Sequence, residues 1–282
     1  MQNQNVLRNS PELWLAHLPK LDAQSNKFTR GHAVVMGGYP LTGAARLAAK
    51  AAARAGAGLV TVIVPKIAFP IYAASLTSIM VKVFTLGSFK ELLADHRVSA
   101  YLVGPGAGSG DSGEIAETRH HAISILATAK PCVLDADAIN VFAGSLAKLK
   151  RSIKGQCVIT PHQGEFERVF EVKHSRLMNA SNAAIASGAI VVLKGSETII
   201  AAPDGRLIIN QNEPPTLATA GSGDVLAGII TGLLAQGMDA FLAAAAGVWI
   251  HGEAANLFGP GLMAEDLPEM LPNVFTNLIK LH

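Results

Sequence analysis

Short apolar runs alternate with longer segments of helical pattern along most of the chain. Runs rich in Val, Ile and Leu with little polar alternation are typical of strands that are covered on both faces, and they occupy residues 32–36, 59–64, 100–103, 131–135, 157–160 and 189–193. Segments of helix-forming composition lie between them, at residues 43–55, 114–127, 165–170 and 176–187. This order predicts an α/β fold with a mainly parallel sheet between two layers of helices.

Smaller elements are predicted before the first and after the last of these segments. Residues 198–202 and 207–210 flank the turn Pro203-Asp204-Gly205, which predicts a hairpin on the sheet's edge. Near the start, Ser10 followed by Pro11 suits the first turn of a helix, so PELWLAHL predicts a short helix packed outside the sheet. Since no linker-like segment divides the chain, we expect one domain over residues 1–282, with 1–25 as a short extension packed on it.

The apolar stretch at residues 225–250 is long enough to resemble a membrane span, which needs about 20 residues. However, Gly237 supplies a helix end and Asp239 a helix start, so the stretch predicts two buried helices. The composition agrees, because 50% hydrophobic residues, 16% charged residues and a mean hydropathy of +0.33 indicate an apolar globular interior. We expect no membrane span.

Charge and cysteine content exclude several classes of partner. Lys and Arg number 23 against 21 Asp and Glu, and no block of like charge occurs, so neither a nucleic-acid partner nor a membrane surface is indicated. Cys132 and Cys157 lie in apolar runs, as buried free thiols do in a reducing compartment. The opening MQNQNVLRNS lacks the basic and apolar regions of a secretory signal. We expect a cytoplasmic protein.

Loops that follow the strands are where an open α/β sheet binds its ligands. After residues 100–103, the stretch 108–113 satisfies GxGxxG, with Asp135 at the end of the next strand, as in a dinucleotide fingerprint. Residues 104–107 separate the strand from that first glycine, however, whereas the fingerprint glycine closes the turn directly. The pattern favours a glycine loop that gives a ligand access to backbone N–H groups, and leaves a true dinucleotide fold as the weaker alternative.

The tetrapeptide GSGD occurs twice, at residues 108–111 and 221–224. The second copy opens directly into an apolar helix, whose first N–H groups and dipole favour a phosphate group. Asp224 beside such a phosphate is a candidate base for a hydroxyl that attacks it. The alternative is that Asp224 merely caps the helix.

Two more loops carry candidate chemistry, although each has an ordinary structural alternative. Residues 194–198, KGSET, offer a cation and hydroxyls to a nucleotide, or form a plain polar turn. His162 and Glu165 stand together at a helix start, where the histidine serves as a ligand or as a cap. No GxxxxGK[ST] occurs, which excludes a Walker-type NTPase.

Together these loops resemble a known family over nearly the whole chain from about Lys27 onward. The segments that carry the resemblance are GHAVVMGG, LTGAARLAAKAAARAGAGLVTV, YLVGPGAG, PCVLDADAIN, VITPHQGEFERVF, VVLKGSETII and TAGSGDVLAGIITGLLAQG. They resemble the ADP- or ATP-dependent NAD(P)H-hydrate dehydratases of the ribokinase-like superfamily. The resemblance implies a three-layer α/β/α sandwich. It also implies a lyase of nicotinamide nucleotide repair, which phosphorylates the ring hydroxyl of hydrated NADH or NADPH and then eliminates phosphate.

The resemblance also implies a role for individual residues. Asp224 matches the catalytic aspartate, and Gly221, Ser222 and Gly223 match the anion hole. Positions that match the hydrate site are Ala45, Gly108 and His162, together with Asp224; those that match the adenine nucleotide site are Lys194, Gly195, Ser196, Glu197, Thr198 and Gly223. Glu165 matches the glutamate that orients Mg²⁺ through water. Asp135 and Asn140 are expected in the same polar floor.

Some positions depart from the family's pattern. Asn26 stands where a histidine is usual, residues 37–41 form a compact loop, and 214–217 replace an asparagine, proline, glycine and methionine run. Bifunctional relatives carry an epimerase domain ahead of this one; with so few residues before Lys27, we expect the epimerase to be a separate protein.

Other functions remain as alternatives: a small-molecule kinase of the hydroxymethylpyrimidine or thiazole type, and a non-catalytic dinucleotide-binding module. Resemblance to bacterial members favours ADP as the phosphate donor and a homotetramer as the assembly. We expect His251 to be a packing residue, because its helix neighbours are small and apolar.

Overall fold

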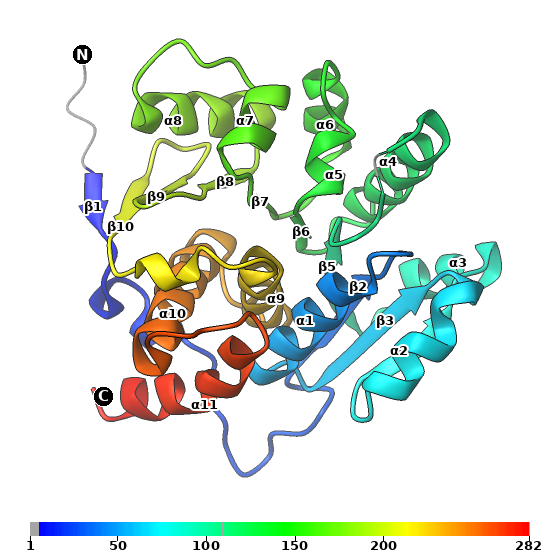
Figure 1. Ribbon diagram of the computed structural model, residues 1–282, viewed down its shortest axis with the longest axis horizontal. Coiled ribbons are helices and arrows are strands. Elements are labelled where there is room, and N and C mark those ends of the chain that lie inside the picture. Colours follow the sequence, from blue (N-terminus) through cyan, green and yellow to red (C-terminus); the bar gives the residue numbers. More distant parts are fainter. Residues whose placement is uncertain (1–5, 109, 282) are drawn as a thin grey trace.

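The structure is a computed structural model of the chain, and it describes residues 6–108 and 110–281. In these residues ten strands form one sheet in the order β1-β10-β9-β8-β7-β6-β5-β2-β3-β4 (Figure 1). Their bounds are β1 Val6–Arg8, β2 His32–Met36, β3 Leu59–Val64, β4 Met80–Val83, β5 Val98–Val103, β6 Cys132–Leu134, β7 Cys157–Ile159, β8 Ile190–Leu193, β9 Thr198–Ala201 and β10 Leu207–Asn210. Among the described strands, β9 alone runs antiparallel to both of its neighbours, and all other pairs are parallel.

Helices cover both faces of the sheet (Figure 1). Their bounds are α1 Thr42–Arg54, α2 Phe69–Ser75, α3 Leu86–Ala94, α4 Ser112–Leu126, α5 Asp137–Asn140, α6 Leu146–Ser152, α7 Gln163–Val169, α8 Arg176–Ser187, α9 Ser222–Ala235, α10 Ala240–Phe258 and α11 Asp266–Ile279. One hydrophobic cluster joins the sheet to α1, α9, α10 and α11, and a second joins it to α3–α8. Along β5, Leu102 belongs to the first cluster and Tyr101 to the second, because successive side chains of a strand point to opposite faces. The predicted α/β sandwich is confirmed.

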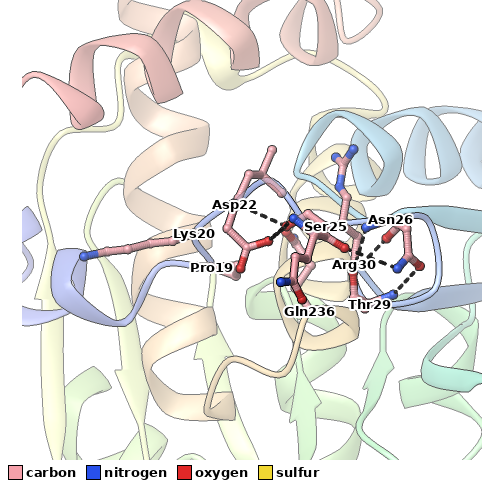
Figure 2. A pocket seen from close by; sticks show the side chains of 10 residues that line it. Pro19, Lys20, Asp22, Ser25, Asn26, Thr29, Arg30 and Gln236 are labelled. Atoms are coloured by element: carbon pink, nitrogen blue, oxygen red, sulfur yellow. Dashed lines mark hydrogen bonds between the residues drawn. The ribbon is translucent and has the colours of Figure 1, made fainter.

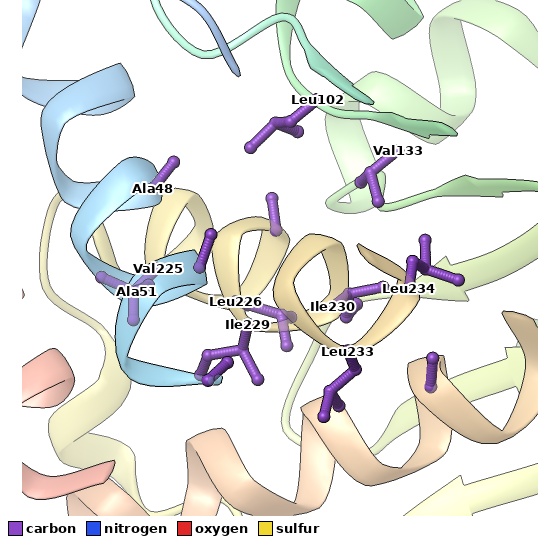
Figure 3. Close-up of a cluster of buried hydrophobic side chains, with 14 of the residues drawn as sticks. Ala48, Ala51, Leu102, Val133, Val225, Leu226, Ile229, Ile230, Leu233 and Leu234 are labelled. Atoms are coloured by element: carbon purple, nitrogen blue, oxygen red, sulfur yellow. The ribbon is translucent and has the colours of Figure 1, made fainter. Parts of the chain in front are cut away.

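The close packing of α1 against α9 fixes the helix that carries Asp224. A side chain at Gly228 would meet the Ala48 carbonyl oxygen at 2.2 Å, and one at Gly232 would meet the Ala52 carbonyl oxygen at 2.5 Å. The two backbones therefore approach as only glycine permits, while the larger residues of α9 fill the space toward the sheet and α10 (Figure 3). This contact explains the alanine- and glycine-rich composition of both segments.

The long apolar stretch forms two helices, as predicted. Gly237 has a φ of +90° after α9, and the Asp239 carboxylate accepts the N–H groups of Phe241 and Leu242 at the start of α10. Among the described residues, no helix has the length and apolar character that crossing a bilayer would require.

The start of the chain differs from the predicted short helix. Two 3-10 turns, Pro11–Leu13 and Leu15–His17, replace it, and the Ser10 side chain makes no capping bond. Trp14 lies between the turns because its fully buried indole N–H donates to Asn9 Oδ1 and its ring packs on Trp249, 5.6 Å between centroids. Tertiary contacts thus override the local helical pattern.

The strand predictions miss the two outermost strands. β1 pairs in parallel with β10, so the predicted hairpin of β9 and β10 has one more strand beyond it. β4 lies at the other edge, where Met80 and Lys82 are exposed, and its four residues show none of the apolar continuity of the central strands. Both are edge strands, whose sequences carry the weakest pattern.

The loop before β2 lines a groove of about 510 Å³ at the amino ends of the strands (Figure 2). Within it Asp22 and Ser25 bond to each other, and Asn26 Oδ1 accepts the N–H groups of Phe28 and Thr29. Asn26, the position that departs from the family pattern, therefore stabilises a turn at the edge of the sheet opposite the predicted site.

Candidate active site

Polar residues gather where β6, β7 and β8 end. The sheet's hydrogen bonds continue past the strands, with Asp135 N–H donating to Val103 O at 3.0 Å, Thr160 N–H to Leu134 O at 3.1 Å and Lys194 N–H to Pro161 O at 2.9 Å. These bonds hold the first residue after each strand in register. The carboxyl edge of the parallel strands therefore places three polar side chains together, as the sequence predicts.

A buried ion pair lies at the centre of this group. Lys194 Nζ is 3.0 Å from Asp135 Oδ1, and the Thr160 hydroxyl donates to the same oxygen at 2.7 Å. Burial lowers the pKa of Lys194, but Asp135, Glu165 and a smaller effect of Asp224 outweigh it, so the net pKa is raised. Lys194 is therefore a cation at neutral pH.

Asp224 faces this pair from the first turn of α9. It is the third helical residue, and Gly221 in the left-handed region precedes the helix. Burial raises the pKa of Asp224 to about 7, and Asp135 adds to the increase while Lys194 opposes it. A carboxyl group of this pKa exchanges protons near neutral pH, which is the property of a general base.

The two GSGD copies have different structural roles. Asp111 is the N-cap of α4, and its Oδ1 accepts from Gly113 N–H at 2.7 Å and Glu114 N–H at 2.9 Å. Asp224 is not the N-cap of its helix, because Gly221 holds that position and makes no side-chain capping bond. The capping explanation thus fits the first aspartate and does not fit the second.

Glu165 and His162 meet at the start of α7. His162 Nδ1 accepts from Gly164 N–H at 3.0 Å, while Glu165 Oε2 accepts the His162 backbone N–H at 2.9 Å. The same histidine is half exposed, with its Nε2 3.4 Å from Glu165 Oε1. His162 is thus a cap, as one alternative predicts, and its exposed ring edge still faces solvent. Burial raises the pKa of Glu165, against the opposing effect of Lys194.

The glycine loop after β5 joins the site through Asp137. Gly108, with a φ of +90°, donates its N–H to Asp137 Oδ2 at 2.9 Å. A side chain at Gly104 would meet the Asp135 carbonyl oxygen at 1.7 Å, so this loop lies directly on the polar group at the end of β6. Ala45 has no exposed surface and packs in the core on α1, so its contact with a ligand stays a prediction.

Ala136 holds a strained backbone between Asp135 and Asp137. Its φ of 47° and ψ of −117° lie in a region that favours glycine. We expect Ala136→Gly to stabilise the protein by about 1 kcal/mol, because relief of strain exceeds the added chain entropy of glycine. Urea unfolding measures this difference. Equal or lower stability of the variant would contradict the strain.

A cleft of about 470 Å³ runs from Lys194 and the α9 N-terminus toward α10. Its walls include most of the predicted nucleotide residues; the lining residues are Lys194, Gly195, Ser196, Thr198, Glu213, Pro214, Pro215, Leu217, Ala218, Ser222, Gly223, Leu226 and His251. Glu197, also predicted, bonds instead to Gln211 Nε2 through its Oε1 at 2.7 Å. The departing run at 214–217 therefore forms one wall of the cleft.

Two residues that the sequence interpretation missed hold this loop in place. Arg176 donates to the carbonyl oxygens of Glu197 and Lys194, both at 2.8 Å. Glu213 Oε1 accepts the Thr198 hydroxyl at 2.8 Å, and burial raises its pKa. Both act across long sequence separations, so no local motif marks them.

Asn140, expected in the polar floor, has other surroundings. Asn140 Oδ1 accepts from Arg168 at 3.2 Å, in a contact between α5 and α7. His251, expected to be a packing residue, is buried in the cleft wall. Asp135, in contrast, belongs to the polar floor with Lys194.

The site's carboxylates are hard oxygen donors, which suit Mg²⁺. Among the described residues, no group of three or more His, Cys, Asp or Glu side chains is arranged to hold a metal ion by itself. Mg²⁺ usually keeps several waters and takes one or two carboxylates together with substrate phosphates. The donor set therefore fits a magnesium ion that arrives with a nucleotide.

A family model described as NAD(P)H-hydrate dehydratase matches residues 33–273, which include every site residue above. The chain belongs to this family. The match confirms the family predicted from the sequence segments, and it favours that family over the vitamin kinases and the non-catalytic module.

Relatives in this family support the assignment. The chain is 39% identical to the bifunctional NAD(P)H-hydrate repair enzyme of Moorella thermoacetica, over 93% of this chain and 52% of that protein. It is 38% identical to the ADP-dependent (S)-NAD(P)H-hydrate dehydratase of Neisseria meningitidis, over 86% of this chain and 82% of that protein. The chain thus spans about half the length of the bifunctional relatives.

Solved structures of similar proteins share the fold. The ADP/ATP-dependent NAD(P)H-hydrate dehydratase of Bacillus subtilis, co-crystallised with ATP and Mg²⁺, superposes with a TM-score of 0.82 at 29% identity, covering 97% of this chain and 99% of that one. A ribokinase-like protein of Enterococcus faecalis gives 0.85 at 25% identity, covering 99% and 98%. The predicted ribokinase-like architecture is confirmed.

Proposed function

We propose that this dehydratase restores NADH or NADPH from the hydrated (S)-form at the expense of ADP or ATP, in nicotinamide nucleotide repair. The observation that carries the proposal is the Asp224 carboxyl, with its raised pKa, at the N-terminus of a buried helix and beside the Lys194 cation. A base, an anion site and a nucleotide cleft meet at this point.

In the first step, Asp224 accepts the proton of the ring hydroxyl as that oxygen attacks the terminal phosphorus. The bond from phosphorus to the leaving nucleotide breaks, so ADP leaves as AMP or ATP as ADP. In the second step the carbon–oxygen bond breaks with the electron pair leaving on phosphate. The ring nitrogen lone pair expels it, and a proton lost from the neighbouring carbon completes the double bond.

Charge that develops on the transferred phosphoryl group is held by the chain itself. Residues 221–223 present backbone N–H groups at the α9 N-terminus, of which that of Ser222 also donates to Thr219 O at 3.3 Å, and the α9 dipole adds to their effect. A side chain at Gly223 would lie 3.2 Å from Lys194 Nζ, so the cation stands directly at this anion hole. Such preorganised donors favour the transition state over the ground state.

Glu165, through water, and the phosphates of the nucleotide would hold Mg²⁺, which supplies neutralisation of phosphate charge when bound. The hydrate is assigned to the Gly108 loop and His162, neither of which lines the nucleotide cleft. Lys194–Thr198 and Gly223 are assigned to the adenine nucleotide. ADP is proposed as the donor, since the Neisseria relative is described as ADP-dependent.

The test is incubation of the protein with hydrated NADH, Mg²⁺ and either ADP or ATP, while the absorbance band of reduced nicotinamide is followed. Recovery that requires nucleotide is the expected result. Phosphorylation of a hydroxymethylpyrimidine or thiazole alcohol without recovery would point to a kinase. Binding of the dinucleotide with neither reaction would point to a non-catalytic module.

The pH dependence should report the state of Asp224. A base that must be ionised, with its pKa raised to about 7, gives kcat/KM an acidic limb near pH 7 instead of the pH 4 region of an ordinary aspartate. Initial rates between pH 5 and pH 9 at constant ionic strength measure it, with the stability of the protein checked at each pH. A flat profile down to about pH 5 would contradict this role.

We also propose the setting of the enzyme. Two buried free cysteines suit a cytoplasmic location. The bifunctional relatives pair two repair activities in one chain, and we infer a functional link to an NAD(P)H-hydrate epimerase activity. A homotetramer remains the proposed assembly.

A further inference from the structure

His251 is a buried histidine in the wall of the nucleotide cleft. It lies on α10, is 4% exposed, and lines the cleft beside Ser222 and Leu226 of α9. In the part of the chain that the structure describes, neither ring nitrogen makes a hydrogen bond of normal geometry, and the polar group that acts on the ring from nearby is the Ser222 backbone at the start of α9. Buried polar groups are normally paired, so an unpaired imidazole at a cleft indicates a partner that arrives with the ligand.

A second unpaired polar group is buried in the turn that packs against α10 beside the cleft. The Thr216 hydroxyl is buried and also lacks a partner among the described residues. Thr216 belongs to the 3-10 turn Pro215–Leu217, and both neighbours of Thr216 line the cleft. Two unpaired polar groups on neighbouring elements beside one cleft therefore accompany the site.

The charge state of His251 limits what it can bind. Burial lowers its pKa to about 4, with the Ser222 backbone as a smaller opposing effect and Lys194 adding to the decrease. The ring is therefore neutral at pH 7 and offers one N–H donor and one acceptor nitrogen. A ribose hydroxyl or the edge of a purine can use both groups, whereas a phosphate oxygen accepts only from the N–H and leaves the acceptor nitrogen unpaired.

The rest of the cleft has one end suited to phosphate and one wall suited to a nucleoside. Lys194 and Gly223 form its phosphate end, while Pro214, Pro215 and Leu217 form an apolar wall suited to a base and its sugar. We propose that His251 is a positioning residue that hydrogen-bonds the nucleoside part of the bound adenine nucleotide. This inference rests on the proposed function, because it takes an adenine nucleotide as the occupant of the cleft.

His251→Leu tests the proposal through nucleotide binding. Loss of one buried hydrogen bond should weaken AMP binding about tenfold and raise the KM for ADP about tenfold, with kcat within about twofold. Binding of inorganic pyrophosphate should stay unchanged, because the phosphate end is untouched. The free variant should melt at the same temperature or higher, since a buried unpaired polar group has been removed. Calorimetric titration and thermal melting measure these effects.

His251→Gln, which keeps a donor and an acceptor, should retain AMP affinity within about threefold of the parent protein.

His32 provides a matched control. It is also a buried histidine, at 7% exposure, but its Nε2 is 2.8 Å from the Thr61 hydroxyl, at the amino end of β2. His32→Leu should lower the melting temperature, because Thr61 loses its partner, and should leave AMP affinity unchanged. The two substitutions are thus expected to move stability and binding in opposite directions.

Unchanged AMP affinity with a lower melting temperature in His251→Leu would overturn the proposal and make His251 a packing residue. An equal loss of pyrophosphate binding would overturn it too. If His251→Leu does not fold, the ring resonances of His251 in the unaltered protein must shift when AMP is added, and unshifted resonances would count against the proposal. The AMP arm needs no dehydration assay, so failure of the proposed function would be seen separately.

Discussion

Asp224→Asn should lower turnover by about 100-fold or more while nucleotide binding stays largely intact. The amide keeps the size of the carboxyl but accepts no proton from the attacking hydroxyl. The N–H groups of the α9 N-terminus and the Lys194 cation remain, so the phosphates keep their anchors. Steady-state rates with hydrated NADH, together with calorimetric titration of ADP, separate the two effects.

The first GSGD copy provides the matched control. Asp111→Asn makes the same chemical change in the same tetrapeptide, and asparagine is an equally good N-cap, so α4 and the rate should both be preserved. Near-normal turnover in Asp224→Asn would refute the assigned base. Equal losses in both variants would show that the assay reports general damage.

Asp224→Asn, which should lower turnover, should at the same time raise the stability of the protein. The pKa of Asp224 is raised from the ordinary aspartate value to about 7 in the folded protein, so the native state binds a proton more readily than the unfolded chain. Stability therefore falls as the pH rises from about 4 to about 7 and stays lower above it. Asp224→Asn removes this cost and should gain on the order of 2 kcal/mol at pH 8, less than the full pKa difference, because the side chain keeps some contact with solvent. The gain should vanish near pH 4.

Much of the fold follows from local pattern because the central strands are buried on both faces. Residues 32–36 and 59–64 are predicted with the bounds that the structure shows, since they are mainly apolar, and so are residues 207–210, because the turn at 203–205 precedes them. The edges of the sheet do not follow in this way. β1 and β4 are short and partly exposed, and the pairing of β1 with β10 joins residues about two hundred positions apart.

The site residues, too, differ in whether local sequence alone could identify them. Asp224 and the loop at 194–198 could be found because each carries its chemistry within a few consecutive residues. Arg176 and Glu213 could not, because each acts only through a contact that folding creates, with a backbone carbonyl or a hydroxyl on another element. His251 shows the limit most clearly, since its helix neighbours are small and apolar and only the tertiary structure places it in a cleft.

Lys194→Met should impair both folding stability and catalysis. The substitution leaves Asp135, whose side chain is 3% exposed, without its ion-pair partner and removes the cation from the anion hole. Breaking a buried pair from one side costs about 3 kcal/mol or more, and loss of a preorganised donor costs about 100-fold in kcat. The acidic limb of the pH profile should move above pH 7, because Lys194 is the group that lowers the pKa of Asp224. Urea unfolding and initial rates measure these effects.

The double variant Lys194→Met/Asp135→Asn distinguishes the structural part of that loss from the catalytic part. With the orphaned carboxylate neutralised, stability should recover by about half or more, because the unpaired buried charge is the main cost. Activity should not recover, since the cation at the phosphoryl group is still missing. Lys173→Met is the control, because its ion pair with Glu171 is exposed on both sides, at 66% and 79%, and its loss should change neither property. If the double variant regained the rate together with the stability, Lys194 would serve the fold alone, and the anion hole would consist of the α9 N-terminus without a side-chain cation.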